Sequence, residues 1–172
     1  MIIANVGFRS KELLGLKVGE ISEGEGWDEK KKKTHIVMKV RKENSKTGKG
    51  RLCVAPVKER VQKVIKHYKE LGIKLDKTDY LFMNPTSKTR KNYGRMIMYN
   101  RLKQVFRESG LQNEFDKENK NVSLYSFRHQ YACWRLRFGD VPIHLLAKQM
   151  GTSVSKIELS LIHISEPTRL GA

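Results

Sequence analysis

The chain has 172 residues, about the size of one ordinary domain, and its 38% hydrophobic content is enough for a modest core and argues against wholesale disorder. It carries 35 lysines and arginines against 18 acidic residues, a formal net charge of +17 that indicates a polyanionic partner: DNA, RNA or an acidic membrane surface. No apolar run approaches the roughly 20 residues that span a bilayer, so a membrane protein is not expected. The start lacks a signal-peptide pattern, and Cys53 and Cys133 lack metal-ligand spacing, so we expect a reduced, cytoplasmic setting and no metal.

The first third of the chain predicts a short helix followed by a β-hairpin. Residues 10–18 favour a helix that runs into an extended piece, and residues 22–34 form a polar turn region with glycines. Residues 35–40 alternate apolar and polar side chains, and residues 51–56 form a second strand-like run that Pro56 stops. Because a basic, glycine-bearing stretch lies between them, we expect a hairpin with a long tip.

The rest of the chain is dominated by helical spacing. A brief strand and a basic loop are expected over residues 80–94, and a polar linker over residues 112–121. Four apolar stripes closed by Gly72, Gly110, Gly139 and Gly151 predict four helices. The stripes are Val57, Val61, Val64, Ile65, Tyr68 and Leu71; Met98, Leu102, Val105 and Phe106; Phe127, Tyr131, Trp134 and Phe138; and Ile143, Leu146, Ala147 and Met150. The fold class is therefore mainly α with a small antiparallel β-sheet, an α+β domain.

Three basic positions stand out by their context. Arg9 precedes a helix pattern with Glu12 three residues on, Lys46 lies at the hairpin tip, and Arg128 follows Tyr125 by three residues, which places the two on one side of a helix. Taken singly, each cation is a solvated or phosphate-contacting charge, and Tyr125 and His129 are packing residues. Their combination carries more information than any one of them.

Together these segments resemble the tyrosine recombinases of the phage integrase type. The stretch "VGFRSKELLGLKVGEI" (6–21) resembles the first arginine box of that family, and "SKTGKGRLCVAP" (45–56) resembles its lysine-bearing hairpin. The stretch from 123 to 158, which begins "SLYSFRHQYACW", resembles its second arginine box running toward the nucleophile. The three boxes occur in the family's order and cover most of residues 1–158, so we identify this region as a partial catalytic domain.

The resemblance implies DNA strand cleavage and rejoining without metal or cofactor. A tyrosine hydroxyl attacks a backbone phosphate, and the bond energy is kept in a 3′-phosphotyrosine. By resemblance, Arg9 and Arg128 grip the non-bridging phosphate oxygens, and Lys46 protonates the leaving 5′ oxygen, which a guanidinium cannot do. Lys49 is the rival lysine in the same loop, although the "SKTG" context favours Lys46. Glu12 orients Arg9 or caps its helix, and His129 is a supporting residue.

The chain departs from the family pattern at two positions in the second box. Tyr125 stands where histidine is common, and a phenol with an unperturbed pKa near 10 donates a hydrogen bond to phosphate but is a poor base. Thr152 stands where histidine or tryptophan is common. Its hydroxyl either binds the phosphate or caps the next helix together with Ser153, and the sequence leaves both roles open.

The third departure concerns the nucleophile itself. The family spacing places the catalytic tyrosine at position 161, which is Leu161 here, and the last tyrosine of the chain is Tyr131. The stretch "LSLIHISEPTR" (159–169) resembles instead the translation of a transposase-type sequencing adapter. We therefore expect residues 159–172 to be a non-native tail, with a natural divergent tail as the alternative; sequencing the source gene across codon 158 separates the two. Complete family members also carry an upstream DNA-clamping domain, so we expect a truncated fragment that is inactive as it stands.

The expected partner is double-stranded DNA, held through phosphates by a basic surface. The candidate contacts are residues 29–34 and 87–95, and among single residues Lys49, Arg51, Lys88, Arg90 and Lys91. The resemblance implies a homotetramer on DNA for the full-length protein, encoded by a bacterium, phage or mobile element and acting in the cytoplasm on the nucleoid. The alternative is a non-catalytic basic DNA- or RNA-binding module, or a ribosome-associated protein. Convergence of Arg9, Lys46 and Arg128 on one pocket separates the enzyme from the binding module.

Overall fold

The computed structural model describes residues 2–23, 35–139 and 141–165, with side chains as far as residue 159. Short helices α1 (Ile3–Val6) and α2 (Ser10–Leu14) come first, and a three-stranded sheet follows with β1 (Ile21–Glu23), β2 (Ile36–Val40) and β3 (Arg51–Ala55). The 3₁₀ turns η1 (Val18–Glu20) and η2 (Lys42–Asn44) flank these strands. The remaining helices are α4 (Lys58–Glu70), α5 (Arg95–Glu108), α6 (Leu111–Lys117), α7 (Ser126–Phe138), α8 (Ile143–Met150) and α9 (Val154–Ser165).

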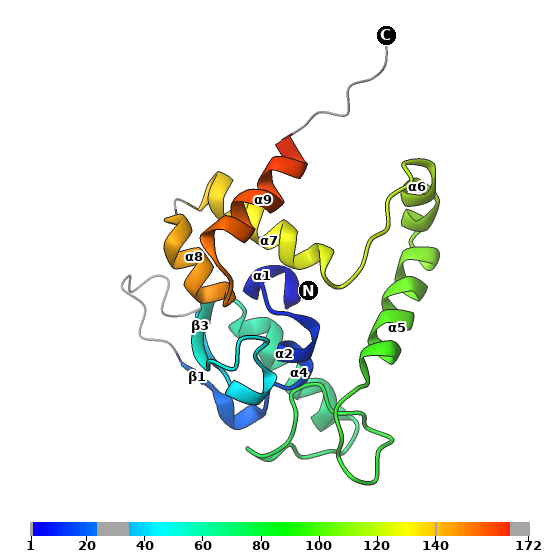
Figure 1. Cartoon of the computed structure of the whole chain (residues 1–172). Helices are drawn as coiled ribbons and strands as arrows, with labels where there is room; N and C mark the ends of the chain where they lie inside the picture. The colour runs from blue at the N-terminus through cyan, green and yellow to red at the C-terminus, as the bar shows by residue number, and fades with distance from the viewer. Residues whose placement is uncertain (1, 24–34, 140, 166–172) are drawn as a thin grey trace.

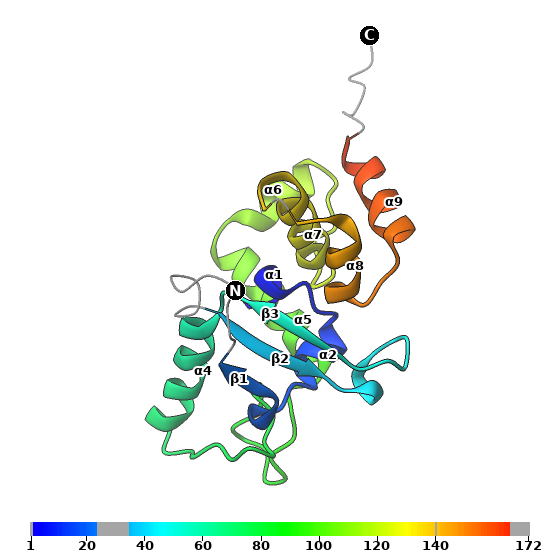
Figure 2. The same ribbon diagram turned by 90° about the vertical axis from the view of Figure 1, so that its left-hand side faces the viewer.

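The sheet is antiparallel with the order β1-β2-β3, and β2 and β3 form the predicted hairpin. Met38 pairs with Cys53 and Val40 with Arg51, so the ten residues 41–50 form the hairpin tip. The alternation along β2 and β3 buries one face and leaves Leu52 and Val54 exposed on the other. This period of two is what a half-buried antiparallel sheet requires. Figure 2 shows the three strands lying side by side, with the tip of the hairpin projecting beyond them.

Two hydrophobic cores build the domain. The first packs the inner face of β2 and β3 against α1, α2 and the start of α4, with Phe8, Met38 and Cys53 fully buried. The second is smaller and lies between α7, α8 and α9, around Tyr131, Leu146 and Met150. Helices α5 and α6 stand to one side of the body (Figure 1) and pack on each other. The observed architecture is therefore the mainly α domain with one small sheet that the sequence predicts.

Several local predictions are wrong in instructive ways. The expected linker over 112–121 begins as helix α6, because Phe115 packs edge-on against Phe106 of α5, with ring centroids 5.1 Å apart. The expected turn region after residue 21 begins as strand β1. The expected strand near residue 80 is reduced to two isolated bridges, Lys17 with Tyr80 and Met83 with Asn92. In each case a tertiary neighbour, which the local pattern does not contain, decides the conformation.

The third apolar stripe is also only partly buried. Tyr131 is buried, whereas Trp134 and Phe138 are 58% and 69% exposed and contact each other with tilted rings. The side of α7 that faces the body instead buries Arg128, Tyr131 and Ala132. The buried side of the helix therefore carries a charged residue, Arg128, next to the apolar Tyr131 and Ala132.

Among the residues that the structure describes, no helix combines the length and the apolar character needed to cross a membrane.

Candidate active site

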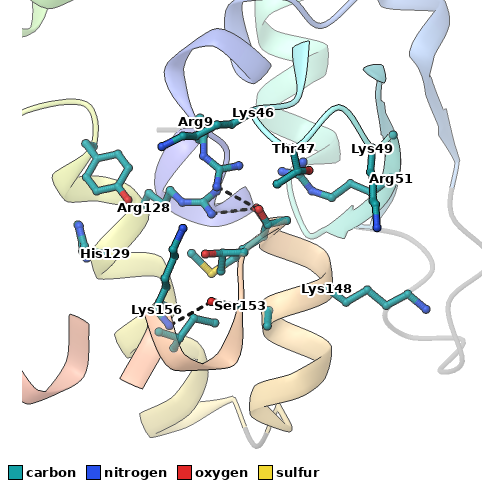
Figure 3. Close-up of a pocket in the computed structure, with 18 of the residues that line it drawn as sticks. Arg9, Lys46, Thr47, Lys49, Arg51, Arg128, His129, Lys148, Ser153 and Lys156 are labelled. Atoms are coloured by element: carbon teal, nitrogen blue, oxygen red, sulfur yellow. Dashed lines mark hydrogen bonds between the residues drawn. The ribbon is translucent and has the colours of Figure 1, made fainter. Parts of the chain in front are cut away.

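A cavity of about 1120 Å³ opens where the two cores meet. Residues from three distant parts of the sequence line it: the first box supplies Arg9, the hairpin tip supplies Lys46, Thr47, Lys49 and Arg51, and the second box supplies Tyr125, Arg128, His129 and Thr152. Figure 3 shows Arg9 and Arg128 side by side, with the hairpin tip above them. The structure thus brings Arg9, Lys46 and Arg128 to one cavity and does not spread them along a face.

Arg9 is held in place by Glu12. Arg9 precedes α2 in an extended conformation, and the Glu12 carboxylate accepts a hydrogen bond from its backbone N–H (2.8 Å) as well as one from Arg9 Nη1 (3.0 Å). Glu12 therefore does both things that the sequence suggested: it caps the helix and orients the arginine. Arg9 Nη2 also donates to the carbonyl of Gly151 (3.0 Å), which ties the first box to the end of α8.

Arg128 is almost completely buried, with 3% of its surface exposed. Its Nη1 donates to the carbonyl of Gly7 (2.5 Å) and its Nη2 to the carbonyl of Met150 (2.9 Å), and Nη1 lies 3.9 Å from Glu12 Oε2. Burial, and then the charge of Arg9, lower the pKa of Arg128 to about 10, so the guanidinium remains charged at pH 7. Two buried carbonyls thus fix its position at the inner wall of the cavity.

Two glycines make these contacts possible. Gly7 (φ 66°) ends α1 and Gly151 (φ 64°) ends α8, both in the left-handed region that L residues rarely adopt. A Cβ at Gly7 would lie 2.4 Å from the Tyr131 ring, and one at Gly151 would lie 2.7 Å from Arg51 Nη1. Glycine is therefore required twice, by conformation and by space, at the two turns whose carbonyls receive Arg128 and Arg9.

Glu12 is the centre of an arginine cluster. The carboxylate is inaccessible to solvent and contacts Arg9, Arg51 and, at 3.9 Å, Arg128. Burial alone would raise the pKa of Glu12, but hydrogen bonds from Arg51 and Arg9 outweigh it and lower the pKa below its usual value of 4.5. Three guanidinium charges against one carboxylate leave the wall of the cavity with a net charge of +2. An anion with two available oxygens is the ligand that such a site favours.

The hairpin tip carries Lys46 and Lys49 over this wall. Its base is tied to the end of α2, since Arg41 Nη2 and Asn44 Nδ2 both donate to the carbonyl of Gly15, at 3.0 and 3.1 Å. Both lysines are exposed and both line the cavity, so the geometry leaves the choice between them open.

Tyr125 and His129 form the opposite side of the entrance. Their rings meet edge-on with centroids 4.7 Å apart, and Tyr125 is 54% exposed. Burial, and then the charge of Arg128, lower the pKa of His129, which favours the neutral imidazole at pH 7.

Thr152 and Ser153 divide the two roles that the sequence offered to Thr152. Helix α9 begins at Val154, and the hydroxyl of Ser153 accepts a hydrogen bond from the Lys156 backbone N–H (3.4 Å). Ser153 is therefore the capping residue. Thr152 lines the cavity, and its contact with a phosphate stays a prediction.

Two arginines that the sequence assigned to DNA contact have other partners. Arg51 lines the cavity, but its guanidinium donates twice to Glu12 and once to the carbonyl of Gln149. Arg90, at a positive φ of 52°, donates twice to Asp79 and once to the carbonyl of Lys74, outside the cavity. These arrangements favour structural roles for both, because carboxylates already occupy the guanidinium edges that would face a phosphate.

The other candidate DNA contacts are surface residues or lie outside the description. Lys88 and Lys91 are exposed on the loop that precedes α5 and are not among the residues that line the cavity. The basic stretch 29–34 lies outside the described residues.

The lining residues that the sequence analysis did not single out include two cations, Lys148 and Lys156. Lys156 points toward Arg128, whereas Lys148 points away from it (Figure 3). A signal was available for Lys156, because it lies within the stretch 123–158 that resembles the second box and in the first turn of α9. Across the described residues, no group of three or more His, Cys, Asp or Glu side chains could hold a metal ion.

The fold is that of the catalytic domain of tyrosine recombinases. The chain is similar to the XerH site-specific recombinase bound to palindromic difH substrate in a post-cleavage complex, with 18% identity and a TM-score of 0.67 over 96% of this chain and 41% of that chain. It is similar to XerH bound to difH in a pre-cleavage complex (17%, TM-score 0.65, 96% and 43%) and to the XerA recombinase (22%, TM-score 0.63, 99% and 55%). No protein-family model matches the chain, and no curated protein matches it significantly.

The chain spans about half the length of these solved structures. At these identities the likeness establishes the fold, and the chemistry has to be argued from the cavity.

Proposed function

We propose that this chain is the greater part of the catalytic domain of a tyrosine-type site-specific DNA recombinase, which breaks and rejoins DNA strands. The observation that carries the proposal is the shared cavity of Arg9, Lys46 and Arg128, on a wall whose net charge is +2. A DNA phosphodiester has one negative charge and two non-bridging oxygens, which suits a pair of neighbouring guanidinium groups. The recombinase-like fold and the order of the three boxes support the same assignment.

Cleavage proceeds by exchange of one phosphoester bond for another. A tyrosine oxygen bonds to phosphorus, the bond from phosphorus to the 5′ oxygen breaks, and the phenol proton is released. Arg9 and Arg128 neutralise the charge that grows on the non-bridging oxygens, with Tyr125 and Thr152 as hydrogen-bond donors. Lys46 gives a proton to the leaving 5′ oxygen. Attack by another 5′ hydroxyl on the 3′-phosphotyrosine reverses these steps and completes the exchange.

The nucleophile belongs at position 161, where this chain has leucine. Ile157 lines the cavity, and position 161 lies four residues further along α9, on the same helix face one turn on. Helix α9 runs from Val154 to Ser165 and so continues past residue 158, where we propose that the non-native tail begins. The chain as it stands is therefore proposed to bind DNA and to cleave nothing.

The partner is proposed to be duplex DNA, bound through its phosphates by the lysines around the cavity. Lys46, Lys49, Lys148 and Lys156 add positive charge to the arginine cluster, and their contribution falls as salt rises. For the full-length protein we propose a homotetramer on DNA, in a bacterial, phage or mobile-element setting, with integrase activity.

The test restores the missing hydroxyl. The Leu161→Tyr variant is prepared in the full chain and in a version that carries the source gene's own continuation after residue 161. Each is mixed with nicked duplexes of randomised flanking sequence, in which a short fragment diffuses away after cleavage and traps the covalent complex. We expect a 3′-phosphotyrosine adduct at residue 161, identified by mass spectrometry.

Leu161→Phe is the matched control, because it adds the ring without the hydroxyl and should give no adduct. The absence of an adduct from both folded tyrosine variants would contradict the proposal. DNA binding without any adduct would favour the alternative of a non-catalytic binding module.

A further inference from the structure

Arg51 occupies an unusual place for a basic residue at the edge of a DNA-binding loop. It is the first residue of β3, directly after the tip that carries Lys46 and Lys49. Its side chain is only 9% exposed, and its Nη1 and Nη2 donate to the two oxygens of Glu12 at 2.9 and 2.8 Å. The guanidinium carbon also lies 5.9 Å from the centre of the buried Phe8 ring. Glu12 binds the edge of the planar guanidinium and the Phe8 ring lies over its face, so the group is held in a single position.

The same side chain fastens β3 to the end of α8. Arg51 Nε donates to the carbonyl of Gln149 (2.7 Å), and the thiol of Cys53 donates to that same carbonyl (3.1 Å). Gln149 Nε2 returns a hydrogen bond to the carbonyl of Val54 (3.0 Å). Burial raises the pKa of Cys53 to about 11, so the thiol keeps the proton that it donates. Two residues further on, Gly151 offers its carbonyl to Arg9.

Arg51 therefore touches each of the three segments that build the cavity. It belongs to the lysine-bearing hairpin, it pairs with Glu12 of the first box, and it bonds to the helix end of the second box. We infer that Arg51 is a positioning residue, which holds Glu12 and the end of α8 so that Arg9 and Arg128 face the DNA phosphate, and that it does not contact DNA itself. This inference rests on the proposed function.

The geometry predicts what happens when Arg51 is lost. Each oxygen of Glu12 then loses one hydrogen bond, and the carboxylate keeps only its bonds to Arg9 together with the charge of Arg128 at 3.9 Å. An under-paired buried carboxylate attracts these two guanidinium groups more strongly. Both groups are then drawn away from the phosphate, which slows cleavage of bound DNA while the exposed lysines still bind the duplex.

The experiment separates cleavage from binding in Arg51→Gln. In the Leu161→Tyr background, the single-turnover rate of adduct formation is measured at saturating DNA. In the chain as it exists, the Kd for duplex DNA is measured over a series of NaCl concentrations from about 50 to about 300 mM. We expect the rate to fall roughly 10- to 100-fold, as for a small misplacement of catalytic groups. The lost charge of Arg51 should change Kd far less than the rate, and the slope of log Kd against log salt should stay the same because no phosphate contact is removed.

Three variants control this result. Arg51→Lys keeps the charge without the paired edge, so it should recover part of the rate. Arg90→Gln removes an equally paired arginine outside the cavity and should leave the rate unchanged. Glu12→Gln should slow cleavage as well, and adding Arg51→Gln to it should cost little more, because both act through one carboxylate.

A direct DNA contact gives the opposite pattern. Arg51→Gln would then weaken binding and reduce the salt slope by about one, with an unchanged rate on bound DNA, and this outcome overturns the inference. A wild-type rate and Kd would overturn it too. If Arg51→Gln does not fold, the same split is read on Arg51→Lys. If the chain with Arg51 intact forms no adduct, the proposed function fails, and the binding experiment alone still decides whether Arg51 contacts DNA.

Discussion

Two bidentate arginine–carboxylate pairs among the described residues differ in what surrounds them. In the loop before α5, Asp79 forms an ion pair with Arg90 and with no other described residue, and the Arg90 side chain is 44% exposed. Beside the cavity, one inaccessible carboxylate, Glu12, is shared by Arg9 and Arg51, with Arg128 close by. The first pair is electrically neutral and closes a loop. The second is a cluster with two positive charges in excess, next to a space that an anion can enter.

This difference shows that the charge available to an anionic ligand depends on how many arginines share one carboxylate. A pair of one arginine and one carboxylate has a net charge of zero and leaves no excess positive charge to attract a phosphate. A carboxylate shared among guanidinium groups fixes them in place and still leaves most of their charge for a ligand. The sequence did not separate the two cases, since Arg51 and Arg90 both stand in basic loops and both were predicted to contact DNA.

The largest expected effect comes from removing the shared carboxylate. Glu12→Gln keeps the shape of the side chain but leaves buried guanidinium charges uncompensated, so we expect the free energy of unfolding to fall by about 3–5 kcal/mol. Asp79→Asn should cause a smaller fall, because water can solvate the exposed Arg90. Urea unfolding followed by circular dichroism measures both. Equal losses for the two variants would show that the cluster is no more than another pair.

The second prediction concerns Arg128 in the Leu161→Tyr background. Arg128→Lys retains a positive charge but loses the planar pair of donors, so we expect adduct formation to slow roughly 100- to 1000-fold. Arg90→Lys, the same change in the neutral pair, should leave the rate unaltered. An Arg128→Lys variant that forms the adduct at the rate of its Leu161→Tyr parent would remove Arg128 from the proposed chemistry.

The third prediction compares the effect on cleavage of a lysine beside the cavity, Lys46, with that of Lys88, on the loop of the Arg90–Asp79 pair. Lys46→Ala should slow adduct formation roughly 100-fold if Lys46 protonates the leaving oxygen. The loss should disappear with a substrate that has sulfur at the 5′ bridging position, because a thiolate leaves without a proton. Lys88→Ala, on the loop of the neutral pair, should not slow cleavage of either substrate. If Lys49→Ala, and not Lys46→Ala, shows the sulfur rescue, the acid is Lys49.

The smallest expected effect is the pH dependence of the stability that Glu12 contributes to the folded chain. The pKa of Glu12 is lowered in the folded chain, so its ionised form contributes stability that is fully present above the usual value of 4.5 and is lost as the pH falls through the lowered pKa. The stability difference between the wild-type chain and Glu12→Gln should therefore be constant at neutral pH and shrink below the usual pKa of 4.5. Urea unfolding at several pH values measures it, and a difference that grows toward acid pH would contradict the assigned direction.

Local patterns predicted most of the elements because those elements depend on near neighbours. The hairpin, α4, α5, α7 and α8 follow from alternation, helical spacing and closing glycines. The local patterns failed where a distant partner decides the conformation: α6 forms against Phe106, and β1 forms against β2. Trp134 and Phe138 fit the spacing of α7 and are nevertheless exposed, since spacing defines a face without saying what covers it.

The sequence by itself determined the kinds of residue available for the site. The sequence contains the net charge of +17, the three boxes in their order, and the glycines at positions 7 and 151. Tertiary structure alone decided how those residues share their charges. It placed Arg51 on Glu12, left Arg9 and Arg128 lining the cavity, and turned Ser153 rather than Thr152 into the helix cap. The physical reason is that a charge balance is set by distances of a few ångströms between side chains, and residues 12, 51 and 128 meet only when the chain has folded.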